Sequence, residues 1–456
     1  MSALPKTSVA SIVLPYLAFA SLLALLCLRL YAAFATTALH TPWDDDHLRA
    51  EARGHAQAQT TVTAISHLVL PWTPPVFEGR LNGYDAWLVA GLKAGRWVGS
   101  SNAELSFQLA NTLLLLVQTL MVLLFARWAT QDWSIAATFA FLHMSAPIVF
   151  GMSRWILTEN PVLVAGPTLS FLGAWLLATP GPAGSQVRAV HVMRAGLAAW
   201  GMALCCSARE YAAPTFMVMV GAVLLGLLMR KRWREAEATV LVTTAFVIPW
   251  YPSLVEALQA TLKKGGESAY FHTMAEWIPH VSFYTVGPSL TFVLTALLAV
   301  VVYQGSRRAI ERLSDPRTTP GELLRSQLSG LRLAGWAHWA LMAFYVAGIL
   351  WTRNRVTRPA IMPMFAALGI VLIGFRAHPR RRRWLRDARI KWTAVGLVSL
   401  SWCVLLWQLL VAFDGGKTYA HAGFRLEYFN YPLHLRKLDG PNDNYICYEP
   451  CPYDRR

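Results

Sequence analysis

The sequence is poor in charged residues and in the short motifs of soluble enzymes. Only 14% of its 456 residues are Asp, Glu, Lys or Arg, against about 25% in a typical soluble domain. It contains no Cys-x-x-Cys pair and no His-Glu-x-x-His run, so no zinc site is indicated. The Walker and Rossmann glycine motifs are also absent, which leaves no sign of a nucleotide site. There is no Asn-x-Ser/Thr sequon either, and this favours a bacterial source.

Long apolar runs are what the sequence has instead. Hydrophobic residues make up 55% of the chain, and most runs approach the roughly 20 residues that a membrane-spanning helix needs. Transmembrane barrels show alternating apolar and polar residues rather than unbroken runs. The sequence therefore predicts an all-α, polytopic bundle of transmembrane helices.

The net charge of +16 reflects how the chain is oriented rather than a nucleic-acid surface. Its basic residues gather in the polar gaps between apolar runs, notably at 230–234, 307–332 and 376–391. Cytoplasmic loops of membrane proteins carry such an excess of Lys and Arg. We therefore expect these three segments on the cytoplasmic side.

This orientation predicts about eleven spans in a transmembrane domain over residues 1–413, with the N-terminus cytoplasmic. The first run could instead be a secretory signal, although it is long for one. The loops 34–106 and 256–285 and the tail 414–456 would be external, and 305–335 and 376–391 cytoplasmic. The first external loop is long enough to carry amphipathic helices. The expected spans are 10–32, 107–126, 133–151, 161–178, 195–208, 211–229, 238–255, 286–304, 336–351, 359–375 and 392–413.

An acidic run, Asp44, Asp45 and Asp46 followed by His47, opens the first external loop. A carboxylate in a partly desolvated cavity can act as a general base if a neighbouring group sets its pKa. Adjacent acids suit this role, since one can stay ionised while another orients it. The other interpretation is that these residues only solubilise the loop.

Two further external turns carry charges next to apolar spans: Arg154 and Glu159 in "SRWILTEN", and Arg209 and Glu210 in "CCSAREYAAP". Arg154 and Glu159 are five residues apart, so helical spacing does not pair them. A charge at the membrane edge is costly unless it faces water, a cavity or a partner. These turns are therefore candidate lining for an external cavity.

Arg355 and Arg358 are exceptions to the excess of basic residues on the cytoplasmic side, because they fall on the predicted external face. Guanidinium groups match phosphate geometry, so with Arg209 they could bind the phosphate of a lipid-linked substrate. Alternatively they are anchors that reach the interface, or partners for Glu159 and Glu210. In the external tail, Cys447 and Cys451 could form a disulfide or remain free thiols.

A series of motifs follows in order along the chain: "DDDHLRAEA", "WTPPVFEG", "RWVGSSNAELSFQLAN", "SAPIVFGMSRWILTEN", "SAREY" and "TRPAIMP". This series resembles the GT-C class of polytopic glycosyltransferases, in particular the protein O-mannosyltransferase and aminoarabinose-transferase branch. The resemblance covers about the first 260 residues and recurs near residue 355. It implies transfer of a sugar from a polyprenyl-phosphate donor to a protein, lipid or polysaccharide acceptor at the periplasmic face of a bacterial inner membrane.

The resemblance also implies roles for individual residues. Asp44 or Asp45 would be the catalytic base, and Glu159 would be a second acid lining the cavity. Three arginines would contact the lipid phosphate: Arg209, Arg355 and Arg358. No cofactor is required, although a divalent cation such as Mg or Mn would suit the acids. A transporter or flippase of a lipid-linked glycan, and an inactive scaffold of the same fold, remain alternatives. The implied substrate-binding residues are Asp46, His47, Arg154, Arg209, Glu210, Arg355 and Arg358.

Overall fold

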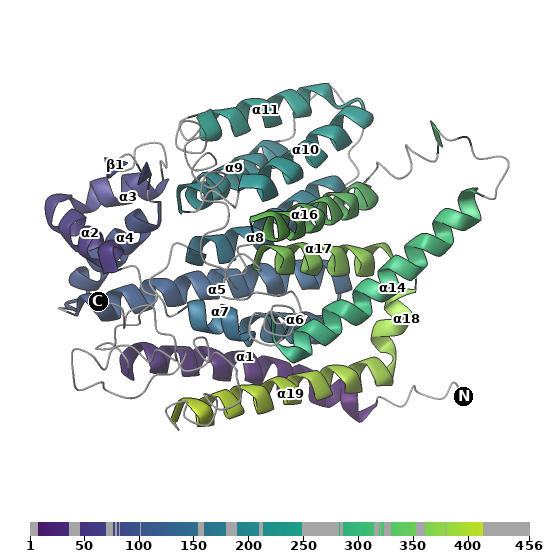
Figure 1. Cartoon of the computed structure of the whole chain (residues 1–456), viewed down its shortest axis with the longest axis horizontal. Coiled ribbons are helices and arrows are strands. Elements are labelled where there is room, and N and C mark those ends of the chain that lie inside the picture. The colour runs from purple at the N-terminus through teal and green to yellow at the C-terminus, as the bar shows by residue number, and fades with distance from the viewer. Residues whose placement is uncertain are drawn as a thin grey trace.

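The chain folds as a bundle of long helices with a small helical unit at one end (Figure 1). The structure is a computed structural model. It describes residues 8–35, 46–69, 76–77, 80–81, 83–100, 102–153, 159–178, 189–208, 213–248, 282, 286–313, 319, 321–322, 330–352, 361–378 and 380–413. Within these residues the only strands are β1 (Val76–Phe77) and β2 (Arg80–Leu81), which form a two-stranded antiparallel hairpin. The predicted all-α class is confirmed.

Every span predicted from the sequence overlaps a helix. The bundle consists of α1 (Val9–Ala35), α5 (Ala103–Thr130), α6 (Trp133–Met144), α7 (Pro147–Met152), α8 (Glu159–Ala178), α9 (Ala189–Ala208), α10 (Ala213–Met229), α11 (Trp233–Val247), α14 (Pro288–Leu313), α16 (Gly330–Thr352), α17 (Ile361–Ala377), α18 (Arg381–Arg386) and α19 (Ala388–Phe413).

Not all of these helices are equally suited to cross a bilayer. By length and composition, five segments of the described chain qualify: Val9–Tyr31, Ala103–Thr130, Asn160–Ala178, Pro288–Arg312 and Ala388–Leu406. The apolar helices α6, α10 and α17 are shorter. The chain is thus a polytopic helical protein, while the number of spans stays a prediction.

The predicted span 133–151 is divided between α6 and α7. Asp132 caps the start of α6, because its Oδ1 accepts hydrogen bonds from the backbone N–H groups of Ser134 and Ile135. It ends at Met144, and α7 starts at Pro147. Proline lacks an N–H and disfavours helical geometry at the residue before it, so the helix breaks here and restarts with proline in its first turn.

Helix α5 is central to the bundle, since it packs against α6, α8 and α17. Helix α1 lies against α6 and α19, and α16 lies against α8, α10 and α17. The buried faces are rich in alanine and aromatic residues; for example, Phe125, Ala126 and Ala129 of α5 are completely buried. Small residues let helix backbones approach closely, as is usual in membrane bundles.

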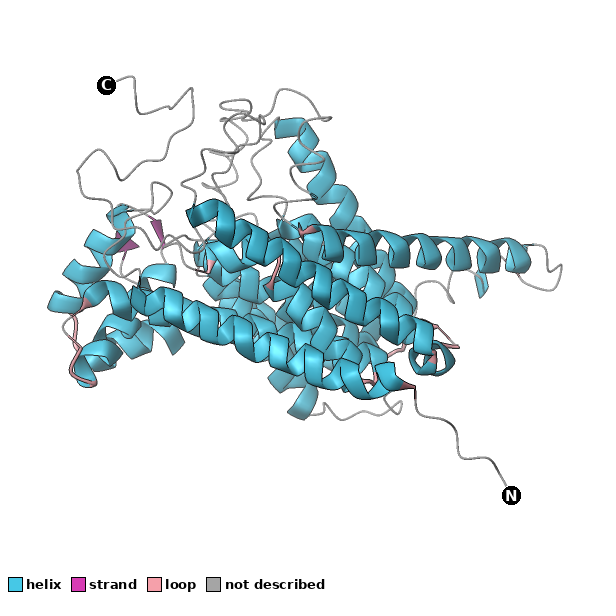
Figure 2. Cartoon of the chain, turned by 90° about the horizontal axis from the view of Figure 1, so that it is seen from below, coloured by secondary structure: helices cyan, strands magenta, loops and turns pink. Residues whose placement is uncertain are grey.

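The described parts of the predicted basic segments lie at one end of the bundle, where α1 begins and where α10, α14 and α17 end (Figure 1). Side chains join the helices there: Lys391 donates to Ser11 Oγ at 3.1 Å, and Arg230 donates to the carbonyl of Leu177 at 2.7 Å. The helical unit lies at the opposite end, as the turned view in Figure 2 also shows. Which side of the membrane each end faces stays a prediction.

The helical unit consists of α2 (Asp46–Ala58), α3 (Thr61–Val69) and α4 (Gly83–Trp97), together with the hairpin. It has a small hydrophobic core of its own, in which Leu48 and Ala52 of α2 meet Tyr84 and Leu88 of α4 and Phe107 of α5. The alternation of buried and exposed residues along α2 confirms the helices expected in the first external loop. Because Phe107 belongs to α5, this core also fixes the unit to the bundle.

Candidate functional site

Only part of the predicted site falls within the described residues. Asp46 and His47 form the start of α2, and Glu159 is the first residue of α8. The other predicted residues lie outside the described part of the chain: Asp44, Asp45, Arg154, Arg209, Glu210, Arg355, Arg358, Cys447 and Cys451. The structure does describe the side chains that hold α2, Ser153 after α7 and the start of α8 in place.

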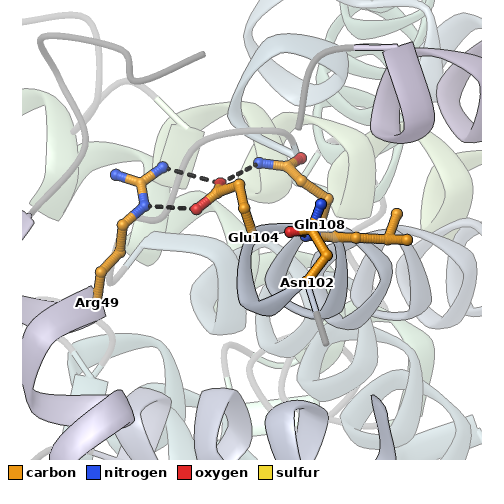
Figure 3. A network of polar contacts seen from close by, with 5 residues as sticks. Arg49, Asn102, Glu104 and Gln108 are labelled. Carbon is orange, nitrogen blue, oxygen red and sulfur yellow. Dashed lines mark hydrogen bonds and ion pairs between the residues drawn. The ribbon is translucent and has the colours of Figure 1, made fainter. Parts of the chain in front are cut away.

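A buried ion pair fixes α2 to α5. Arg49, one helical turn after Asp46, is buried and directs its guanidinium at Glu104 in the first turn of α5. Its Nε lies 3.0 Å from Oε2 of Glu104, and its Nη2 donates to Oε1 at 3.1 Å (Figure 3). Such a two-bond pair is geometrically specific. It therefore orients the helix that directly follows the acidic run.

Gln108 extends this pair toward a second buried arginine. Its Nε2 donates to Oε1 of Glu104 at 3.2 Å (Figure 3), and its own Oε1 accepts from Nη2 of Arg29 at 3.0 Å. Arg29 lies near the end of α1 and is completely buried. Its Nε donates to Oγ of Ser153 at 3.0 Å, and its Nη2 to the carbonyl of Ser153 at 2.7 Å. Arg29 thus holds the residue that directly precedes Arg154.

A second set of bonds holds the start of α8. The hydroxyl of Tyr84 on α4 donates to Oδ1 of Asn111 on α5 at 2.7 Å. The same hydroxyl accepts from Nδ2 of Asn160 at 3.2 Å. All three residues are buried. Since Asn160 follows Glu159 in the sequence, the helix that begins with this acid is fixed against α4 and α5.

These contacts bring together segments that are distant in the sequence. The network defined by Arg29, Arg49, Glu104, Gln108 and Ser153 joins α1, α2, α5 and the turn after α7. Buried polar contacts of this kind favour one arrangement of the elements they join. The start of α2 and Ser153, just after α7, therefore lie at the same end of the bundle.

One further acid pairs with histidine inside the helical unit. Oδ2 of Asp85 on α4 lies 2.6 Å from Nδ1 of His55 on α2. Burial raises the pKa of Asp85 to about 6 and the charge of Glu51 also raises it, while His55 acts in the opposite direction. This carboxylate can change its charge near neutral pH, but it serves the packing of α2 on α4.

The residues that build this network were not among those predicted from the sequence. Arg29 carried a signal, because it is a charge inside the first apolar run, and charges in such runs need an interior partner. Arg49, Gln108, Asn111 and Asn160 carried none that distinguishes them from ordinary loop or helix residues. Among the described residues no group of three or more His, Cys, Asp or Glu side chains could hold a metal ion. The cation suggested for the acidic run thus stays a prediction about residues outside that part.

Residues 65–263 match the family described as dolichyl-phosphate-mannose-protein mannosyltransferase. No curated protein and no solved structure matches the chain. The matched region extends from α3 to beyond α11, so it contains Glu104, Gln108, Ser153 and the start of α8. It confirms the predicted resemblance to this branch of glycosyltransferases, and the apolar helices indicate an integral membrane protein.

Proposed function

From the match to the mannosyltransferase family, we propose that this protein transfers a sugar from a polyprenyl-phosphate donor to an acceptor on the external face of the membrane. The observation that carries the proposal is the buried network of Arg29, Arg49, Glu104, Gln108 and Ser153. It fixes α2, whose first residue directly follows Asp44 and Asp45 in the sequence, and it fixes Ser153, six residues before Glu159.

In the proposed reaction, Asp44 or Asp45 accepts the proton of an acceptor hydroxyl. The hydroxyl oxygen then bonds to the anomeric carbon of the donor sugar as the bond from that carbon to the phosphate oxygen breaks. The polyprenyl phosphate leaves with the electron pair, and the sugar is transferred with inversion. A base of this kind contributes typically 10²–10⁴-fold to the rate.

The leaving phosphate gains negative charge, which Arg209, Arg355 and Arg358 would stabilise. Guanidinium groups fixed before the reaction stabilise such developing charge without reorganisation. Glu159 would line the same cavity as a second acid, and Asp46, His47, Arg154 and Glu210 would contact the substrates. The acceptor would be a protein, a lipid or a polysaccharide, and the membrane the bacterial inner membrane.

The network residues have a different proposed task. Arg49 and Glu104 bond to one another rather than facing outward, so they position α2 and do not take part in proton transfer. Displacing a catalytic group by about 1 Å can cost 10²-fold in rate. A rigid attachment directly behind the acidic run would therefore benefit the reaction.

The test is release of polyprenyl phosphate by the purified protein, supplied with polyprenyl-phospho-sugars and a crude envelope acceptor. Wild type is compared with Asp44→Asn, Asp45→Asn and Glu159→Gln, and with Glu237→Gln as a control, because Glu237 is an exposed acid on α11. We expect sugar-dependent release that Asp44→Asn or Asp45→Asn lowers by at least about 10²-fold and that the control leaves unchanged. Equal release by wild type and all variants would refute a carboxylate base. No release by wild type with any donor, together with uptake of lipid-linked glycan into vesicles, would indicate the transporter.

A further inference from the structure

At the basic end of the bundle, a cavity of about 610 Å³ lies between α14, α16, α17 and α18. Its lining changes from one end to the other. Apolar residues such as Leu297, Val301 and Ile370 line the deeper part, whereas arginines and tryptophans line the part near the helix ends. The volume falls within the roughly 300–1,000 Å³ of ordinary ligand sites.

Three arginines converge at the outer end of this cavity. Arg308 and Arg312 are one helical turn apart on α14, and Arg332 lies in the first turn of α16. Burial lowers the pKa of Arg332, and the nearby charges of Arg312 and Arg308 lower it further. Like charges at this helical spacing destabilise a helix. None of the described residues that line the cavity is an Asp or a Glu, so the charge of this lining favours an anionic ligand.

Tryptophans near these arginines indicate that this end of the cavity lies at the membrane–water interface. Trp336, Trp339 and Trp384 line the same end of the cavity, and tryptophan is enriched at the membrane–water interface. His378 lies there too, just beyond the end of α17. Its pKa is lowered by burial and then by the charges of Arg308 and Arg380, which indicates positive potential at this end.

The apolar part has the length of one membrane leaflet. Leu297 and Arg308 are eleven residues apart on α14, which is about 16 Å of helix. Half of the roughly 30 Å hydrocarbon core is of similar length. A molecule with its phosphate at the arginines would therefore place an acyl chain along Val301 and Ile370, as a lipid of this leaflet does.

We propose that the cavity binds one anionic phospholipid of the phosphatidylglycerol type, with its phosphate between Arg308, Arg312 and Arg332 and one acyl chain in the apolar part. Basic pockets between transmembrane helices on the cytoplasmic side recognise such head groups. The site lies at the end of the bundle opposite the proposed catalytic segments. It is thus independent of the proposed transfer reaction.

The test is native mass spectrometry of the full-length protein in detergent, after addition of phosphatidylglycerol or of phosphatidylcholine with the same acyl chains. We expect wild type to retain one phosphatidylglycerol and little phosphatidylcholine. The Arg308→Gln/Arg332→Gln variant should bind phosphatidylglycerol about tenfold more weakly or worse, because each basic residue near the surface contributes to attraction. Arg307→Gln is the matched control, since Arg307 is exposed on the same helix and pairs with Glu311 at 2.8 Å.

A second pair of variants tests the apolar part. Val300 lines the cavity, and Val300→Trp should weaken lipid retention without changing charge. Tyr303→Trp adds an indole to the exposed surface of the same helix, outside the lining, and should retain lipid as wild type does. Three results would overturn the proposal: equal retention of both lipids, unchanged retention in the arginine and Val300 variants, or displacement of the lipid by inorganic phosphate alone. Size-exclusion profiles matching wild type confirm that each variant is folded.

Discussion

The guanidinium of Arg49 on α2 bonds to both carboxylate oxygens of Glu104 on α5, at 3.0 and 3.1 Å. This pair spans 55 residues of sequence and is buried on both sides. Desolvation of two charges is costly, so a buried pair is weak evidence for net stability. Its value lies in geometry, because it gives α2 a single position on α5.

The first prediction follows from that pair. Glu104→Leu leaves the guanidinium of Arg49 buried without its carboxylate, so we expect it to lower the free energy of unfolding by about 3–5 kcal/mol. Thermal unfolding in detergent measures this. The double variant Arg49→Met/Glu104→Leu should recover most of the stability, since apolar replacement of both partners is often neutral. It should not recover polyprenyl-phosphate release, because α2 would lose its orientation. Full recovery of release would show that the pair does not position the acidic run.

Arg29 supports the second prediction. Arg29→Lys keeps the charge but has no planar fork, so it cannot reach Ser153 Oγ, the Ser153 carbonyl and Gln108 Oε1 together. We expect a lower melting temperature and slower release. Arg127→Lys is the control, because Arg127 lies near the opposite end of α5 and stacks on Trp133, with 5.1 Å from its Cζ to the ring centroid. Similar effects of both substitutions would mean that Arg29 has no particular role in holding the turn after α7.

Much of the fold was predictable because lipid imposes a simple rule on sequence. Apolar runs of sufficient length must be helices, and each expected span overlaps at least one helix of the described chain. The break between Met144 and Pro147 was missed because hydropathy does not register it, although proline marks it. Arg29 could have been found as a charge within an apolar run. The pairing of Arg49 with Glu104 and that of Asn160 with Tyr84 could not have been predicted, since both depend on how segments distant in the sequence pack together.

The third prediction concerns pH. Burial raises the pKa of Asp85 from its ordinary value of 3.8 to about 6. For an acid with a raised pKa, the stabilising contribution is fully present below the unfolded pKa and is lost as pH rises through the folded pKa. The α2–α4 packing should therefore weaken between about pH 4 and pH 6 from this group alone.

Thermal unfolding of wild type and Asp85→Asn, compared at about pH 4.5 and about pH 7.5, isolates this contribution. The advantage of wild type over Asp85→Asn should be greater at the lower pH, because asparagine does not titrate. Glu237→Gln, which changes an exposed acid, should show no such dependence. A pH-independent difference between wild type and Asp85→Asn would show that the carboxyl ionises in the fold as it does in the unfolded chain.

The last prediction concerns close packing of α17 on α16. At Gly369 an added Cβ would collide with the imidazole of His338, which is completely buried and whose Nδ1 lies 2.8 Å from the carbonyl of Ala334. Because the ring cannot move without disturbing that contact, Gly369→Ala should destabilise the bundle by about 1–3 kcal/mol. Gly221→Ala is the matched control: it lies within α10 with nothing near its added Cβ, and alanine is the better helix former by about 1 kcal/mol. Thermal unfolding should thus show opposite signs for the two substitutions, and a stabilising Gly369→Ala would mean that α16 and α17 are not in contact at His338.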